Sequence, residues 1–335
     1  MILQVRNLTT RLRMNSKCYT VVDHLSFDLK RGRTLALVGE SGCGKSLTAQ
    51  SLLGILPTPP ALPPQGEVLF RGINLLGLSE ARMSQIRGRE IAMIFQNPTM
   101  ALNPIYTIGY QMLEVVDTHL KLEAEAAQNL VLQTFKEVHL RDPLDLMKSY
   151  PHQLSGGMLQ RVMIAMALIC SPSILIADEP TTALDMTIQA QILLLLKEIQ
   201  EKKGMAILII THDMGVVAEI ADEVIVMYGG KQIEEGDVET IFDYPAHPYT
   251  QALFAASPDH RGSRRYLPTI KGSVPPLEEL PIGCPFHPRC PKAMDKCRSH
   301  PLSSFSLLQK NHKTSCWLYD QPSDLKYLHE RTSKS

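Results

Sequence analysis

Residues that could bind phosphate are concentrated in one short, glycine-rich segment. The sequence Gly39-Glu40-Ser41-Gly42-Cys43-Gly44-Lys45-Ser46 has the spacing G-x-x-x-x-G-K-S, and it lies between the apolar run Thr34–Val38 and the helix-forming run Ser46–Leu53. Glycines at these positions let backbone N–H groups face phosphate oxygens at the positive end of the following helix. Lys45 would neutralise β- and γ-phosphate charge, and the Ser46 hydroxyl would bind Mg²⁺. The segment therefore predicts a nucleotide-binding loop.

A pair of carboxylates follows a second apolar run. Asp178 and Glu179 come directly after Ile174–Ala177, and ligands of open α/β sheets bind at the carboxyl ends of strands. Asp178 could hold Mg²⁺ through water, and Glu179 could polarise the water that attacks a γ-phosphate. The alternative is that the two acids cap a following helix, which Pro180 disfavours.

The segment Leu154–Gly157 (LSGG) could supply a second anion site. Ser155 and the N–H groups of Gly156 and Gly157 stand at the start of a helix-forming run, where an anion is favoured. The alternative is an ordinary helix cap made by a serine.

Short apolar runs are the elements that must position these groups. Thr34–Val38, Ile174–Ala177, Ala206–Ile210 and Glu223–Met227 suit parallel strands that are buried on both faces. A crossover helix is predicted from Ile188, Ile192, Leu195 and Ile199, which recur at helical spacing. The proline-rich stretch Pro57–Pro64 is predicted to be a loop. This alternation is typical of an α/β domain.

Two further regions differ in character. Between Asn97 and Gln153 the pattern is mostly helical, and Leu122, Ala126, Leu130 and Val138 are expected on one buried helix face. After Gly236 the chain becomes richer in Pro, His and Cys. We therefore expect a helical insertion and a C-terminal extension.

Composition narrows the class of protein. Lys+Arg and Asp+Glu both total 34 in 335 residues, so no basic footprint for nucleic acid is present. The N-terminal segment lacks the apolar run of a signal peptide, and no stretch approaches the ~18 apolar residues of a membrane span. Seven cysteines, an odd number with one inside the phosphate loop, favour a reducing cytosolic setting.

Taken together, six motifs resemble those of ATP-binding cassette (ABC) ATPases, in that family's order. They are the phosphate loop, Gln96 after Ile91–Phe95, LSGG, the Asp178-Glu179 pair, the loop Ala183-Leu184-Asp185, and His212. The resemblance implies a P-loop NTPase cassette over residues 1–235, with a mixed sheet core and a helical subdomain at about 97–165. It also implies that ATP and Mg²⁺ are the cofactors.

The same resemblance implies roles for single residues. Gln96 would reach Mg²⁺ or the attacking water, and His212 would contact the γ-phosphate. Ser155, Gly156, Gly157 and Asp185 would act on ATP held by a second cassette. Met158 departs from the commoner Gln of the signature, which affects the neighbouring surface. Tyr19 is the nearest candidate for stacking on adenine.

The C-terminal extension, residues 236–335, contains HPYTQAL at 247–253 and the cysteines Cys284, Cys290, Cys297 and Cys316. Both features resemble the C-terminal region of D-type ATPase subunits from oligopeptide and dipeptide permeases. In some of those relatives the cysteines hold an iron–sulphur cluster, and four thiolates are the ligand set of [4Fe–4S]. The alternative is four free buried cysteines.

The function implied by the resemblance is ATP hydrolysis that couples cassette dimerisation to import of oligopeptides or dipeptides. Its partners would be a second cassette (a paralogue or a second copy), two transmembrane permease subunits and, indirectly, an external solute-binding protein, without nucleic acid. The protein would lie peripherally on the cytoplasmic face of the bacterial inner membrane. Open alternatives are an importer of nickel or another small solute, a soluble ABC ATPase acting on DNA or ribosomes, and a non-catalytic cassette.

Overall fold

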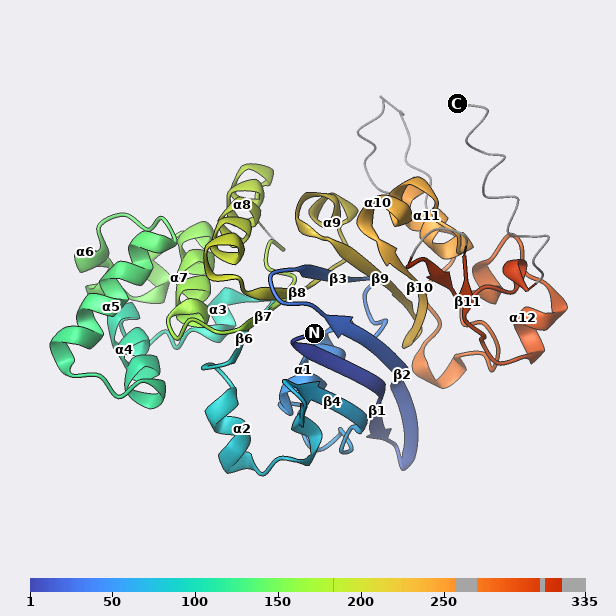
Figure 1. The fold of residues 1–335 in the computed structure, drawn as a ribbon, viewed down its shortest axis with the longest axis horizontal. Helices are drawn as coiled ribbons and strands as arrows, with labels where there is room; N and C mark the ends of the chain where they lie inside the picture. Colours follow the sequence, from blue (N-terminus) through green and yellow to red (C-terminus); the bar gives the residue numbers. More distant parts are fainter. Residues whose placement is uncertain (183, 257–269, 308–310, 321–335) are drawn as a thin grey trace. The chain divides into compact units, whose positions relative to one another are not determined.

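A computed structural model describes residues 1–182, 184–256, 270–307 and 311–320 (Figure 1). They form two compact units. The first unit contains Met1–Ile2, Leu29–Thr34 and Gly77–Ile210, and the second contains Leu3–Asp28, Leu35–Leu76 and the described residues from Thr211 onward.

Three parallel strands form the centre of the first unit. β7 (Ile174–Asp178) pairs with β6 (Ile91–Ile94) on one side and with β8 (Ala206–Thr211) on the other. Every residue of β7 and β8 is buried, as is required of parallel strands that are covered on both faces. The predicted strands at 174–177 and 206–210 are thus confirmed, and each extends by one polar residue.

The rest of the first unit is helical. Its helices are α2 (Glu80–Ile86), α3 (Pro98–Ala101), α4 (Ile108–His119), α5 (Ala124–Glu137), α6 (Pro143–Lys148), α7 (Gly156–Leu168) and α8 (Met186–Lys203), with a 3₁₀ turn at Pro151–Gln153. Figure 1 shows α4, α5 and α6 gathered beside α7. The helical character predicted for 97–153 and the crossover helix at α8 are confirmed.

The predicted buried face of α5 is correct at Val138, which is fully buried at the C-cap, but the earlier predicted positions are offset by about one residue. Ala127, Val131 and Phe135 are buried, whereas Ala126 is exposed and Leu122 is 42% exposed. Leu122 precedes the helix, which begins at Ala124. The buried stripe follows the large Phe135 ring rather than the leucines.

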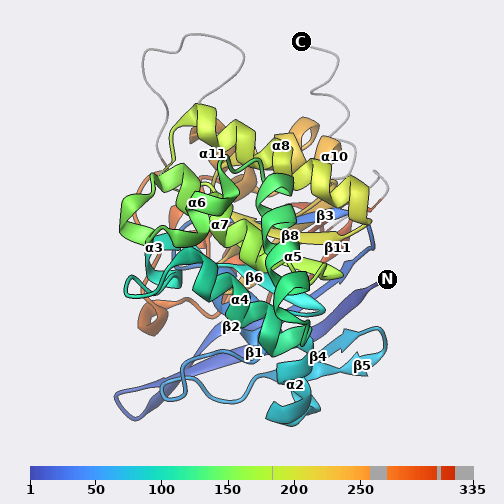
Figure 2. The same cartoon turned by 90° about the vertical axis from the view of Figure 1, so that its left-hand side faces the viewer.

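The second unit contains a four-stranded sheet in the order β2-β1-β4-β5 (Figure 2). Its strands are β1 (Leu3–Met14), β2 (Lys17–Leu29), β4 (Gln65–Phe70) and β5 (Ile73–Asn74). Asn15 and Ser16, with φ of 48° and 65°, make the two-residue turn between β1 and β2. This sheet was not predicted from the sequence. Tyr19, the candidate for stacking on adenine, lies half-buried in β2.

A mixed sheet accompanies it in the same unit. β3 (Thr34–Val38) runs parallel to β9 (Glu223–Tyr228), whereas β10 (Lys231–Asp237) is antiparallel to β9 and to β12 (Lys313–Thr314), which pairs with β11 (Phe305–Ser306). The helices of this unit are α1 (Lys45–Leu53), α9 (Met214–Ile220), α10 (Val238–Asp243), α11 (Pro248–Ala256) and α12 (Asp295–Ser299), with 3₁₀ turns at Leu75–Gly77, Leu277–Glu279, His287–Arg289 and Trp317–Tyr319. The predicted loop at Pro57–Pro64 is confirmed, since only a bridge of Ala61 with Leu12 interrupts it. Within the described ranges, no helix combines the length and apolar character that crossing a bilayer requires.

Candidate nucleotide-binding site

The phosphate loop joins β3 to α1 in the second unit. Lys45, the first residue of α1, is only 5% exposed, and its Nζ donates hydrogen bonds to the carbonyl oxygens of Gly39 (2.7 Å) and Glu40 (3.0 Å). The ammonium therefore lies against its own loop, where its charge adds to the positive end of the helix. The exposed part of the loop is Ser41 and Gly42, and Ser46 is half-buried.

Two glycines of the loop admit no other residue. Gly39 and Gly44 have φ of 153° and 99°. A Cβ atom on Gly44 would lie 2.5 Å from the Val21 carbonyl oxygen, and one on Gly39 would collide with the Met227 carbonyl oxygen. Cys43 is fully buried, and burial raises the pKa of its thiol, so this side chain is neutral and contributes packing.

The Asp178-Glu179 pair stands at the end of β7 in the first unit. Asp178 is 4% exposed, and Glu179 has a left-handed φ of 47°. Gln96 Nε2 donates to Glu179 Oε2 (2.6 Å), and Thr182 Oγ1 donates to the same oxygen (2.9 Å). The structure thus brings Gln96 and Glu179 together across 83 residues. Thr182 was missed, although it lies in the turn directly after the acidic pair.

Ser155 and Asp185, which were predicted to act on ATP held by a second cassette, are both N-terminal helix caps. Ser155 caps α7 by accepting the Met158 N–H (3.4 Å), and Asp185 caps α8 by accepting the Ile188 N–H (2.9 Å). Ala183 of the same predicted loop lies outside the described residues. The cap interpretation of Ser155 is therefore correct as far as folding is concerned, and it leaves the hydroxyl proton available to a ligand.

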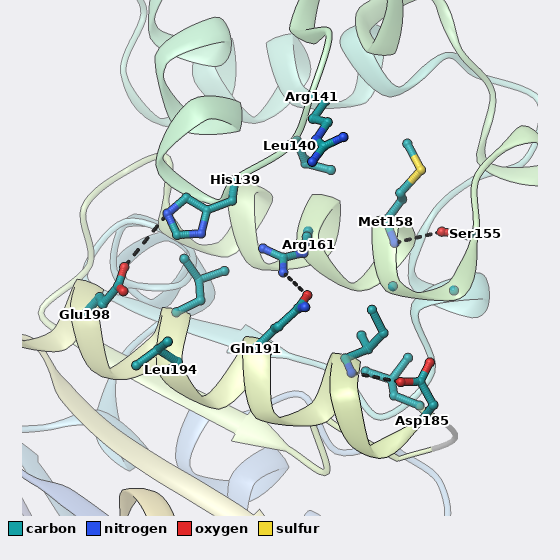
Figure 3. A pocket seen from close by; sticks show the side chains of 15 residues that line it. His139, Leu140, Arg141, Ser155, Met158, Arg161, Asp185, Gln191, Leu194 and Glu198 are labelled. Carbon is teal, nitrogen blue, oxygen red and sulfur yellow. Dashed lines mark hydrogen bonds and ion pairs between the residues drawn. The ribbon is translucent and has the colours of Figure 1, made fainter.

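The four predicted residues line one cleft of about 810 Å³ in the first unit. They are Ser155, Gly156, Gly157 and Asp185. Figure 3 shows Ser155 and Asp185 near one end of this cleft and His139 with Glu198 near the other. Arg161 lies between them.

Three further residues that line this cleft were not predicted from the sequence, namely His139, Arg141 and Arg161. Arg161 donates to the Gln191 side chain (3.0 Å) and to the Val138 carbonyl oxygen (2.9 Å), and burial lowers the pKa of its guanidinium. Arg141 and Arg161 bring positive charge to the lining, and Asp185 and Glu198 bring negative charge, so the feature that favours an anion is the helix N-terminus at Ser155–Gly157.

His212 follows β8, as predicted, and belongs to the second unit with the phosphate loop. His212 is exposed, and it lies between Thr211 and Asp213. Asp213 accepts the Gly215 N–H (2.8 Å) and so begins α9 directly after the histidine. The turn that carries His212 is therefore fixed at both ends.

Two residues of the C-terminal region contact the phosphate loop, and the sequence analysis predicted neither contact. Tyr249 Oη accepts the backbone N–H of Glu40 (2.7 Å), and Arg289 donates to both carboxylate oxygens of Glu40 (2.7 and 3.2 Å). Tyr249 and Arg289 follow Glu40 in the chain by 209 and 249 residues, respectively. No local sequence signal could have found them.

The four C-terminal cysteines line one very small cavity, about 10 Å³, together with His287. All four are free thiols, and burial raises the pKa of Cys284 to about 11 and of Cys316 to about 12, with a further contribution from neighbouring thiols. In the part of the chain that the structure describes, no three His, Cys, Asp or Glu side chains converge to hold a metal ion. The cysteines are gathered, without a preformed metal site among these residues.

Comparison with known sequences agrees with the motifs. The family model described as ABC transporter matches residues 22–182, and the one described as oligopeptide/dipeptide transporter, C-terminal region, matches residues 233–297. The chain is 47% identical over 95% of both chains to the probable peptide ABC transporter ATP-binding protein y4tR of Sinorhizobium fredii. It is 48% identical to the dipeptide transport ATP-binding protein DppD of Bacillus subtilis, over 96% of this chain and 95% of the relative.

Solved structures support the same assignment. The ATP-binding cassette MJ0796, solved as a dimer in a post-hydrolysis state with ADP and Pi bound, aligns with a TM-score of 0.63 and 27% identity. The alignment covers 70% of this chain and 98% of the cassette. The fold is therefore that of an ABC cassette, an ATP-hydrolysing P-loop enzyme. The chain belongs to the ABC transporter ATP-binding proteins whose cassette is followed by the oligopeptide/dipeptide transporter C-terminal region.

Proposed function

We propose that this chain hydrolyses ATP to drive the import of oligopeptides or dipeptides through separate permease subunits. The observation that carries the hydrolytic part is the group Gln96, Glu179 and Thr182, in which two donors hold one carboxylate at the end of a buried parallel strand. The peptide part is supported by the match of residues 233–297 and by the transport activity named for the relatives.

Each predicted site residue has a proposed role toward Mg²⁺-ATP. The loop Gly39–Ser46 holds the phosphates through its N–H groups, and Lys45 neutralises β- and γ-phosphate charge. The Ser46 hydroxyl, Gln96 and Asp178 are the proposed Mg²⁺ ligands, directly or through water. His212 contacts the γ-phosphate.

Glu179 is the proposed general base. Its carboxylate accepts a proton from the attacking water as the water oxygen bonds to the γ-phosphorus, and ADP leaves with the electrons of the broken P–O bond. Glu179→Gln keeps the shape of the side chain and its acceptor oxygen for Gln96 and Thr182, but it removes the basicity.

The test is ATP turnover by the Glu179→Gln variant. We expect ATP binding to be retained while turnover falls by about 100-fold or more, the usual contribution of a positioned base. Glu137→Gln is the matched control, because Glu137 lies in the same unit and pairs with Lys203 (3.2 Å). Wild-type turnover in Glu179→Gln would remove Glu179 as the base.

A second cassette, a paralogue or a second copy, is the proposed partner at the cleft of Figure 3. Ser155 and the N–H groups of Gly156 and Gly157 would donate to the γ-phosphate held by that cassette, and Asp185 would act across the same interface. The helix N-terminus at Ser155–Gly157, which lines the cleft beside Arg161, supports this role. The solved cassette MJ0796 is likewise dimeric.

Two permease subunits are the proposed membrane partners, and they would receive peptides from an external solute-binding protein. The helical region exposes apolar side chains at Met100 (84%), Ile105 (70%), Tyr106 (42%) and Tyr110 (53%), and the two tyrosine rings stack at 4.7 Å. Exposed apolar side chains clustered in one segment suit a protein interface. Binding there would hold the chain on the cytoplasmic face of the bacterial inner membrane.

ATP-dependent uptake into proteoliposomes tests the cargo. Vesicles that contain this chain, its partner cassette and the two permeases should take up a labelled dipeptide when the binding protein is supplied. Uptake of Ni²⁺ without uptake of peptide would overturn the peptide assignment while leaving the ATPase intact.

Cys284, Cys290, Cys297 and Cys316 are the proposed ligands of an iron–sulphur cluster. Four thiols on one cavity are the donor set of [4Fe–4S]; because this cavity measures only about 10 Å³, loading would have to widen it as well as release the thiol protons. After anaerobic purification we expect about four iron and four sulphide per chain, lost in Cys290→Ser but kept in the control Cys170→Ser. Absence of both elements from the wild-type protein would leave the cysteines a packing role.

We also propose that the cassette ends near residue 235, with a helical subdomain at about 97–165 and a separate C-terminal region at 236–335. The two family matches, 22–182 and 233–297, support this division.

A further inference from the structure

Glu40 places a negative charge in the loop that is proposed to bind phosphate. It is the second residue of Gly39–Ser46, and its side chain is 24% exposed. A carboxylate in this place repels the polyphosphate that the loop must hold, unless another group cancels its charge. The structure supplies such a group from the C-terminal region.

Arg289 forms a two-pronged ion pair with Glu40. Its side chain is 6% exposed, and its two terminal nitrogens lie 2.7 and 3.2 Å from the two carboxylate oxygens. The same guanidinium donates to Tyr228 Oη (3.1 Å) and to the carbonyl oxygens of Lys271 (2.9 Å) and Gly272 (3.1 Å). A guanidinium with this many acceptors is fixed in place and matches the carboxylate in geometry.

Tyr249 holds the backbone of the same residue. Its hydroxyl oxygen accepts the Glu40 N–H at 2.7 Å, and its side chain is fully buried. The Glu40 carbonyl oxygen meanwhile accepts from Lys45 Nζ. The N–H, the carbonyl and the carboxylate of Glu40 therefore each have a partner, and two of these partners come from beyond residue 247.

A packed aromatic group fixes both of these partners. The rings of Tyr228, Tyr249 and Phe286 are all buried, with centroids 4.7 to 5.2 Å apart. Arg289 lies over Tyr228 and Phe286, 5.8 and 5.9 Å from their centroids. Such packing limits the motion of the hydroxyl and of the guanidinium.

We propose that Arg289 and Tyr249 are positioning residues for ATP binding, with Arg289 cancelling the charge of Glu40 and Tyr249 fixing its backbone. The inference rests on the proposed function, in which the loop Gly39–Ser46 holds the ATP phosphates. It gives the C-terminal region a direct role in nucleotide affinity.

The test is the dissociation constant of Mg²⁺-ATP, measured by titration calorimetry on the purified full chain. Arg289→Met leaves Glu40 as an uncompensated charge, and we expect Kd to rise about tenfold, which is about 1.4 kcal/mol. In a Glu40→Gln background the same Arg289→Met change should raise Kd by less than about threefold. Raising salt should narrow the difference between Arg289→Met and wild type.

Two further variants keep the result interpretable if Arg289→Met folds poorly. Arg289→Lys retains a cation but loses the two-pronged geometry, so its Kd should lie between those of the wild type and Arg289→Met. Tyr249→Phe keeps the buried ring and removes only the acceptor of the Glu40 N–H, and should raise Kd about threefold in either background. Lys313→Met is the matched control, since it removes a cation that pairs with Glu235 rather than Glu40.

Lys45→Ala separates this inference from the proposed function. If Lys45→Ala binds ATP like the wild-type chain, the loop is not the phosphate site and the proposed function fails. If Lys45→Ala loses binding while folded Arg289→Met and Tyr249→Phe bind normally, only the positioning role is overturned. An Arg289→Met defect that Glu40→Gln does not relieve also refutes the cancellation of charge.

Discussion

Replacing Glu234 by alanine should weaken the attachment of the segments at 246–247 and 312 to the mixed sheet of the second unit. Glu234, in β10, is 1% exposed. Its carboxylate accepts hydrogen bonds from the N–H groups of Ala246 (2.7 Å) and His247 (2.8 Å), and His312 Nε2 lies 2.8 Å from it. One buried side chain therefore joins three separate segments.

The size of the effect follows from these contacts. A hydrogen bond to a charged acceptor contributes about 1.5–3 kcal/mol, and removing one partner of a buried pair typically costs about 3–5 kcal/mol. Alanine would leave two backbone N–H groups and an imidazole buried without their acceptor. We therefore expect Glu234→Ala to lower the free energy of unfolding by about 3–5 kcal/mol.

Urea unfolding followed by tryptophan fluorescence is a suitable assay, because Trp317 is the single tryptophan of the chain and lies in the affected region. Glu235→Ala is the matched control. The Glu235 carboxylate pairs with Lys313, whose side chain is 51% exposed, so its loss should cost less than about 1 kcal/mol. Equal losses in the two variants, or a loss under about 1 kcal/mol in Glu234→Ala, would refute this reasoning.

Two other predictions concern the same unit. Burial lowers the pKa of His247 to about 3, so between about pH 6.5 and 3 the unfolded chain binds a proton that the folded chain does not, and stability should fall by about 1.4 kcal/mol per pH unit as acid is added. His247→Asn, which keeps an acceptor for the Tyr249 N–H, should flatten that dependence in urea unfolding at pH 4–7; an unchanged slope would contradict the assignment. Gly39→Ala should lower the melting temperature more than Gly42→Ala, because the new Cβ would meet the Met227 carbonyl oxygen, whereas no described atom lies within 4 Å of a Cβ at Gly42; similar melting temperatures would count against that collision.

Local motifs could be predicted from the sequence because each is complete within a few residues. The strand Thr34–Val38 has its predicted bounds, and Glu223–Tyr228 differs from its predicted range by one residue. Continuous apolar runs of this kind have few alternatives to a buried parallel strand. Gln96 and Glu179 lie just beyond the carboxyl ends of the paired strands β6 and β7, which is why they meet, although a contact between them was not predicted.

The antiparallel sheet of the second unit was missed for a physical reason. β1 and β2 are 12 and 13 residues long, with buried positions mixed among exposed polar ones. That pattern is a weaker signal for a strand than a continuous apolar run. In addition, β1 pairs with β4, which lies about sixty residues away in the chain. The error in the face of α5 is similar, because Leu130 and Val131 are both apolar and only packing selects Val131.

Contacts between distant segments lay beyond any sequence pattern. Nothing near Glu40 indicates that Arg289 neutralises it, and nothing near β10 indicates that His312 reaches Glu234. Each such contact depends on tertiary structure that brings together residues far apart in the sequence. The sequence shows each of these residues, but it does not indicate which of them contact one another.

The distance in sequence between Glu40 and its partners has a consequence for the newly made chain. Synthesis of the 249 residues that separate Glu40 from Arg289 takes about 12–50 s at about 5–20 residues per second. During that interval Glu40 has been made but Arg289, its ion-pair partner, has not. With the role proposed for Arg289, the loop would reach its full affinity for nucleotide only once residue 289 has been added, so that a residue translated late completes a site translated early.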